Sequence, residues 1–249
     1  MTNHTPETDA TRSIRSASMT AGVALLLMSV LAGLGKFVAL DGLVTQGNAA
    51  RTATDIAESD GLFRLGIASM FLVIVLDVVV AWALYRVFRP VNKNLSMLAA
   101  AFRLVFAGVF MVAIGQLLGV VRLLGNDEYL SVLNADQLNA QALLGINAFN
   151  DLWVVGLGLF GIHLLIIGYL AYRSGYVPKL LGVLIAIAGL GYVIDSFGIV
   201  LSQSSWSEIA TYTFIGEFLL ALWLVIRGPH LTLSQPRLRE DPVAAARQP

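Results

Sequence analysis

Long apolar runs fill most of this 249-residue sequence. They cover residues 19–40, 63–88, 99–124, 148–172, 180–201 and 208–226. A helix needs about 20 apolar residues to cross the hydrocarbon core of a bilayer, and each run is near or above that length. Lipid offers no partners for backbone N–H and C=O groups, so each run must bond its own backbone as a helix. The sequence therefore predicts an all-α, polytopic membrane protein with a six-helix transmembrane bundle.

Composition excludes several classes of function. Only 13% of the residues are charged, whereas a soluble domain carries about 25%. The net charge is zero, which gives no electrostatic basis for nucleic-acid binding. The chain has no cysteine and three histidines, of which His4 and His230 fall in expected tails. We therefore expect neither a metal site nor a cofactor.

The distribution of charge predicts the orientation, because cytoplasmic loops of membrane proteins are enriched in Lys and Arg. One set of loops and ends is basic: Arg12, Arg15, Arg86, Arg89, Lys93, Arg173, Lys179, Arg227, Arg237, Arg239 and Arg247. The other set is mainly acidic: Asp41, Asp55, Glu58, Asp60, Asp127, Glu128, Asp136 and Glu208. Both termini are therefore predicted to be cytoplasmic.

The chain divides into three parts on this reading. Residues 1–18 and 229–249 are rich in Thr, Ser, Pro and Arg and are predicted to be disordered cytoplasmic tails. Residues 19–228 form the transmembrane domain. Within it, residues 41–62 are predicted to hold one short amphipathic helix whose Ala, Ile and Leu side chains face the membrane surface.

Glycines recur at helical spacing in two of the runs. Small residues let transmembrane helices approach closely, so these positions are expected to pack helices together. They are Gly108, Gly115, Gly119, Gly182 and Gly189. Packing within the bundle is the simpler interpretation. Homo-oligomerisation through the run at 99–124 is the alternative.

Polar residues interrupt the apolar runs, and each is costly at the bilayer centre unless it faces the bundle interior and has a partner. The candidates for a cavity, or for a proton- or ligand-binding site, are Asp77, Arg103, Gln116, His163, Tyr192, Asp195 and Glu217. Counting about 1.5 Å per residue places Asp77 and His163 at the same depth, so a His–Asp pair is expected. Arg103 is expected at the cytoplasmic start of its helix, where it closes the inner end of the cavity or binds lipid phosphate. Taken alone, His163 is better interpreted as making a purely structural hydrogen bond.

No catalytic signature is present. The sequence lacks HExxH, G-x-S-x-G and a P-loop, and no second intramembrane histidine accompanies His163. This favours a protein that is not an enzyme.

Three segments closely resemble one family of uncharacterised bacterial membrane proteins. They are ALYRVFRPVNKNLSMLAAAFRLVFAG (83–108), FGIHLLIIGYLAYRSGYVPKLLGVLIAIAGLGYVIDSF (160–197) and IGEFLLALWLVIRG (215–228). The family is catalogued as domain of unknown function forty-three eighty-six. The resemblance implies a multi-pass protein of the bacterial inner membrane, and it assigns no activity. It places Arg103, His163, Pro178, Tyr192, Asp195 and Glu217 within motifs typical of the family.

Three functions remain in competition. The first is binding or transport of a small molecule, ion or proton through a polar cavity open to the outer side. The second is a non-catalytic membrane subunit or scaffold that packs through glycine-rich helix faces. The third, an intramembrane lipid-modifying enzyme, ranks last because no nucleophile or metal set is visible.

Overall fold

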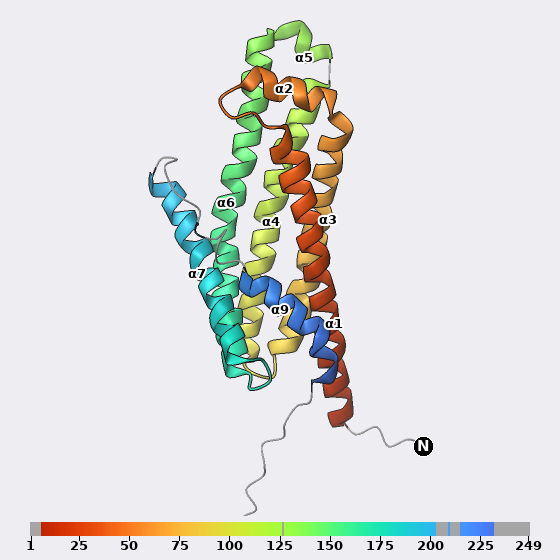
Figure 1. Ribbon diagram of the computed structural model, residues 1–249, viewed down its shortest axis with the longest axis vertical. Helices are drawn as coiled ribbons and strands as arrows, with labels where there is room; N and C mark the ends of the chain where they lie inside the picture. Colours follow the sequence, from red (N-terminus) through yellow and green to blue (C-terminus); the bar gives the residue numbers. More distant parts are fainter. Residues whose placement is uncertain (1–5, 126, 203–208, 210–214, 232–249) are drawn as a thin grey trace, which may run out of the picture.

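The computed structural model describes residues 6–125, 127–202, 209 and 215–231, and these contain helices and no β-strand (Figure 1). The long helices are α1 (Pro6–Ala32), α3 (Asp60–Phe88), α4 (Lys93–Leu124), α6 (Ala135–Arg173) and α7 (Lys179–Ser202). A π-helix, η1 (Gly33–Leu40), continues α1. The shorter helices are η2 (Asp41–Leu43), α2 (Ala49–Glu58), α5 (Asp127–Val132), α9 (Ile215–Ile226) and η3 (Gly228–His230).

The long helices and α9 form a ring that follows the order of the chain. Contacts join α1 to α3, α3 to α4, α4 to α6, α6 to α7, α7 to α9, and α9 back to α1. Consecutive long helices run in opposite directions along the long axis (Figure 1). The first and last described helices thus meet, and the Arg15 side chain donates a hydrogen bond from Nε to the Leu231 carbonyl at 2.8 Å.

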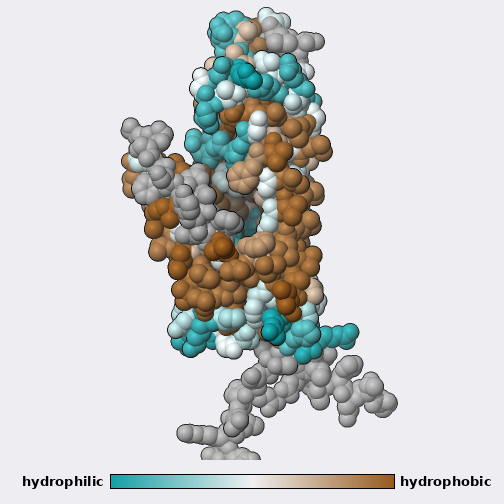
Figure 2. Space-filling view, in the orientation of Figure 1, coloured by the Kyte–Doolittle hydropathy of each residue, from teal (hydrophilic) through white to brown (hydrophobic). Residues whose placement is uncertain are grey.

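On the face shown in Figure 2, an apolar band covers the middle of the bundle and hydrophilic residues gather at both ends. Five described helices are long and apolar enough to cross a membrane: Thr11–Leu43, Asp60–Phe88, Lys93–Leu124, Ala135–Arg173 and Lys179–Ser202. In length and composition they agree with five of the six predicted spans. Of the sixth, 208–226, residues 208 and 210–214 lie outside the described part. Its described helix, α9, has 12 residues and is about 18 Å long, roughly half of a hydrocarbon core.

Two helices start earlier than their apolar runs because side chains cap them. The Asn92 side chain accepts a hydrogen bond from the Leu95 N–H, so α4 begins at Lys93 instead of 99. A capping box between Asn134 and Gln137 starts α6 at Ala135, well before the apolar run at 148. This early part of α6 carries the polar residues Asp136, Gln137, Asn139, Gln141 and Asn147 among apolar ones. Together with α2 and α5 it forms the hydrophilic upper end in Figure 2.

The short helix expected within residues 41–62 is present as α2. Its Thr52, Ala53 and Ile56 are buried, and the helix packs mainly against α6. Its apolar face therefore covers the bundle and not the membrane surface, because the extended α6 offers an apolar partner at that height.

The segment expected as an N-terminal tail is helical from Pro6 onward. Ile14, Ala17 and Ser18 are buried, and the Arg86 side chain donates a hydrogen bond to the Ser13 hydroxyl. These contacts with the rest of the bundle outweigh the weak helix propensity of Ser and Thr. Residues 1–5 and 232–249 of the predicted tails lie outside the described part.

Tyr176 fastens the loop between α6 and α7 to the end of α3, because its hydroxyl donates to the Val87 carbonyl at 2.6 Å. Burial raises the pKa of the Tyr176 hydroxyl, so the folded protein holds this proton more tightly than the unfolded chain. Stability should therefore fall as pH rises above about 10, the ordinary tyrosine value. Tyr176→Phe should cost about 1 kcal/mol at neutral pH and weaken this alkaline loss. Unfolding in detergent at pH 7 and pH 11 checks both effects, and equal alkaline losses in the two proteins would contradict them.

Candidate functional site

A charged cluster lies inside the bundle, at one level on three helices. Asp77 lies 11 residues from the end of α3, Arg103 lies 10 from the start of α4, and His163 lies 10 from the end of α6. The antiparallel arrangement places all three about 15–17 Å from the same end of the bundle. Their exposed fractions are 1%, 2% and 0%. Together with Tyr192 and Glu217, which adjoin them, we call these residues the polar cluster.

Arg103 is the centre of the polar cluster. Its Nε and Nη2 both donate to Asp77 Oδ1, at 2.8 and 2.7 Å. Its Nη1 lies 3.2 Å from His163 Nε2. The expected contact between Asp77 and His163 is thus made through the guanidinium, and no direct bond joins the two among the described contacts. Arg103 lies deeper than expected because α4 begins at Lys93.

The hydrogen bonds of His163 define its protonation. Nδ1 lies 2.8 Å from the Ala99 carbonyl, which can only accept, so Nδ1 carries the hydrogen. Arginine can only donate, so Nε2 must offer its lone pair to Arg103. His163 is therefore the neutral Nδ1–H tautomer, held from two sides. This assignment follows from the hydrogen-bond partners.

Two less polar side chains also contact the guanidinium. Its carbon lies 5.0 Å from the centre of the Phe160 ring, and its Nη2 lies 3.9 Å from the Met28 sulfur. The Phe160 ring also stacks on His163 and meets Tyr192 edge-on, at 5.7 and 5.6 Å between centroids. Sequence reasoning missed Phe160 and Met28. Phe160 precedes His163 by three residues on the same helix face, which is the signal that could have identified it.

Glu217 brings a second carboxyl to the polar cluster from the first turn of α9. The charges of Arg103 and Asp77 both act on it, and the Tyr192 hydroxyl lies within hydrogen-bonding reach. The residue is partly exposed as a whole, but its Oε1 atom is buried without a hydrogen-bond partner. Asp77 Oδ2 is likewise buried without a hydrogen-bond partner. The polar cluster therefore has two buried acceptor atoms that the described residues leave unused.

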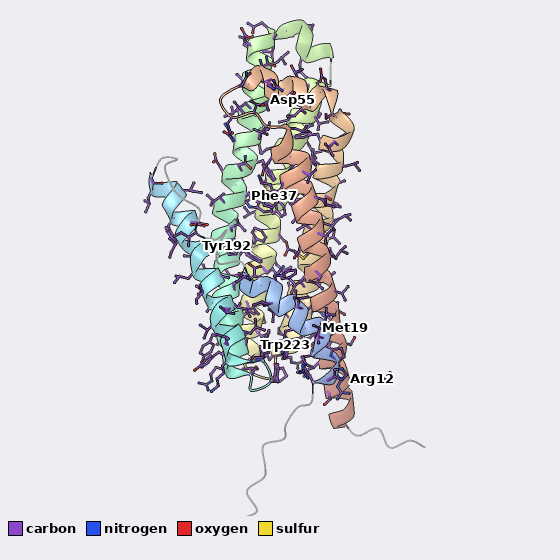
Figure 3. All side chains as sticks on the ribbon, in the orientation of Figure 1. Arg12, Met19, Phe37, Asp55, Tyr192 and Trp223 are labelled. Atoms are coloured by element: carbon purple, nitrogen blue, oxygen red, sulfur yellow. The ribbon has the colours of Figure 1, made fainter. Side chains whose placement is uncertain are left out.

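Tyr192 and Asp195 lie one helical turn apart on α7. Tyr192 is at about the height where α9 begins (Figure 3). Asp195 is 4% exposed, its Oδ1 accepts the Ile209 N–H at 2.9 Å, and its charge acts on Tyr192.

Gln116 is 13 residues beyond Arg103 on α4, about 20 Å away, and is partly exposed. It lies apart from the polar cluster.

The apolar band is interrupted just above α9. Figure 2 shows a hollow there, between α1 and α6, in which white and teal atoms are visible. In the described part of the chain, α9 closes the seam between α1 and α7 only along its own length. The hollow therefore lies on the same side of the bundle as the end of α9 that carries Glu217.

The glycines expected to pack helices fall into two groups. A Cβ on Gly182 would lie 2.7 Å from the Tyr172 nitrogen, and one on Gly189 would lie 2.6 Å from the Gly161 oxygen. These two therefore allow the close contact of α6 with α7. At Gly108, Gly115 and Gly119 a Cβ would meet nothing within 4 Å. That face of α4 is turned away from the other described helices.

The described residues contain no group of three or more His, Cys, Asp or Glu side chains that could hold a metal. Chemically, the polar cluster offers one permanent cation, one paired carboxylate, one neutral imidazole and one further carboxyl with a phenol beside it.

Comparison with known proteins identifies a family. The family model described as Domain of unknown function (DUF4386) matches residues 20–228. An "Uncharacterized protein" from Archaeoglobus fulgidus is 42% identical over 167 residues, which cover 67% of this chain and 85% of the relative. No solved structure matches.

Proposed function

We propose that this chain, which belongs to the family described as Domain of unknown function (DUF4386), binds a small molecule or ion inside the membrane and transports it. The observation that carries the proposal is the buried Arg103–Asp77 pair with Glu217 beside it. A charge at the centre of a membrane helix costs at least about 2.5–3.5 kcal/mol on insertion scales. Neutral side chains could pack the helices together with a far smaller insertion free energy. The presence of these charges therefore supports a binding role.

The route to the polar cluster is proposed to lead from the outer side. The hollow above α9 supports this, because it lies on the side away from the basic end of the bundle. By the charge rule, the basic end, where α1 begins and α9 ends, is proposed to be cytoplasmic. We place the protein in the plasma (inner) membrane.

Ligand-dependent stability tests the proposal. Purified protein in detergent is screened for a rise in Tm with a panel of inorganic monovalent cations, small amines and small carboxylates. A compound of the panel should raise the Tm of the wild type and leave that of Glu217→Gln unchanged. In proteoliposomes, a gradient of that compound should collapse through the wild type and persist with Glu217→Gln. Gly115→Ala is the matched control, because Gly115 lies on the face of α4 that points away from the bundle. It should behave as wild type.

The neutral variants also show how the proposal fails. If Asp77→Asn and Glu217→Gln both fold and match the wild type in binding and transport, the polar cluster serves only to hold the helices together.

A scaffold role is the second candidate, and the outward face of α4 favours it. Gly108, Gly115 and Gly119 lie on that face, and no described residue lies within 4 Å of a Cβ at these positions. Close helix contacts in membranes use such positions, and a second copy is the simplest occupant. Native mass spectrometry in mild detergent tests this: a strictly monomeric wild type that copurifies with no protein would count against it.

A further inference from the structure

Charge counting in the polar cluster leaves one group without compensation. Arg103 and Asp77 neutralise each other through the paired bonds on Oδ1. His163 is neutral, because each ring nitrogen is used by a partner that fixes its role. An ionised Glu217 therefore leaves the cluster with one net negative charge, and a protonated Glu217 leaves it neutral.

Neither His163 nor Asp77 is placed to take up a proton. A second hydrogen on His163 would sit on Nε2 and point at the N–H of Arg103 Nη1, 3.2 Å away. A hydrogen on Asp77 would cancel the ion pair and leave the buried guanidinium without an anion, which is the costly case. His163 and Asp77 thus keep their protonation states and hold Arg103 in position.

Glu217 is placed differently. Its Oε1 is buried and has no partner, so a hydrogen there displaces no existing bond. The groups that act on it are Tyr192 from α7, with Asp195 behind, Arg103 from α4 and Asp77 from α3. His163 from α6 contacts the same Arg103. Helix α1 also packs on α9, and it has no titratable side chain between Arg15 and Lys36. Among the described residues that act on Glu217, Arg103 is thus the one cation, and it is already paired with Asp77.

We propose that the Glu217 carboxyl is a binding site for one positive charge. When no ligand is bound, an exchangeable proton occupies this site. Release of that proton ionises the carboxyl, and the cluster then attracts a singly charged cation to the unused oxygens of Glu217 and Asp77. Proton and ligand compete for one carboxyl, so the ligand class is a small monovalent cation. This inference rests on the proposed function for the identity of the ligand, but the proton site is testable without any ligand.

Infrared difference spectroscopy of the purified wild type across a pH series detects the proton directly. The carbonyl stretch of a protonated carboxyl in an apolar site should decrease as pH rises, by an amount that corresponds to one carboxyl per chain. Glu217→Gln should abolish the titrating band. Asp195→Asn removes another buried carboxyl of the same bundle and should retain it. Tyr192→Phe, which removes the hydroxyl beside Glu217, should shift the midpoint of the titration.

Each outcome has a clear meaning. A wild type without a titrating band, or a band that survives in Glu217→Gln, overturns the proton site. If Glu217→Gln fails to fold, Glu217→Asp keeps a carboxyl of different reach, and an unchanged band and midpoint in that variant would also overturn it. A titrating band in a protein that binds and transports nothing from the panel would leave the proton site standing and remove the transport function.

Discussion

Asp77→Leu is expected to lower the unfolding free energy by about 3–5 kcal/mol, because it leaves a buried guanidinium without its anion. Arg103→Leu should cost less, since the stranded Asp77 can take up a proton whereas arginine stays charged. For the same reason the loss in Arg103→Leu should shrink as pH is lowered. The double variant should recover most of the loss. Reversible unfolding in detergent, followed by circular dichroism, measures all three.

Glu217 provides the control for this series. In Asp77→Leu it is the remaining carboxylate within range of Arg103, so adding Glu217→Gln should deepen the loss. If the double variant of Asp77 and Arg103 loses as much as the two single variants together, the two side chains are not coupled.

Gly189→Leu is the second large effect we expect. Its Cβ would lie 2.6 Å from the Gly161 oxygen and 2.8 Å from the Leu165 nitrogen, so the backbone of α6 would have to move. Overpacking usually costs about 1–3 kcal/mol, and this site should reach at least the upper end. Because α7 positions Tyr192, the same change should also alter the infrared titration assigned to Glu217.

Gly115→Leu is the matched control, because a Cβ there meets nothing within 4 Å. It should leave the unfolding free energy of a monomer unchanged within about 0.5 kcal/mol. A loss comparable to that of Gly189→Leu would mean that another molecule packs against this face. Size-exclusion chromatography of both variants separates unfolding from a change in oligomeric state.

The depth of polar residues could be read from the sequence wherever the ends of the helices were clear. Asp77 and His163 were expected at one level, and both touch Arg103. Arg103 itself was misplaced, because its helix begins with six residues that are less apolar than the run and are started by the Asn92 cap. Apolar length alone does not report such a cap.

Rotation about the helix axes could not be predicted. Gly115 and Gly189 are equivalent as sequence signals, since each belongs to a regular series of glycines in an apolar run. One faces outward and the other touches α6. All-round apolar helices carry no polar face to mark the outside, so only the packing partners decide which glycine is used. The sixth span shows the same limit, because apolar length did not reveal how α9 lies against α1 and α7.

The order of the ring also has a consequence for biogenesis. Asp77 and Arg103 belong to consecutive helices, α3 and α4, joined by a turn of four residues. The two charges can therefore meet within a single hairpin and enter the lipid as a neutral pair, without a contact from α6. Glu217 arrives last, on the helix that joins α7 to α1. The growing chain can thus form the buried Arg103–Asp77 ion pair early. The Glu217 carboxyl joins the polar cluster only when α9 closes the ring.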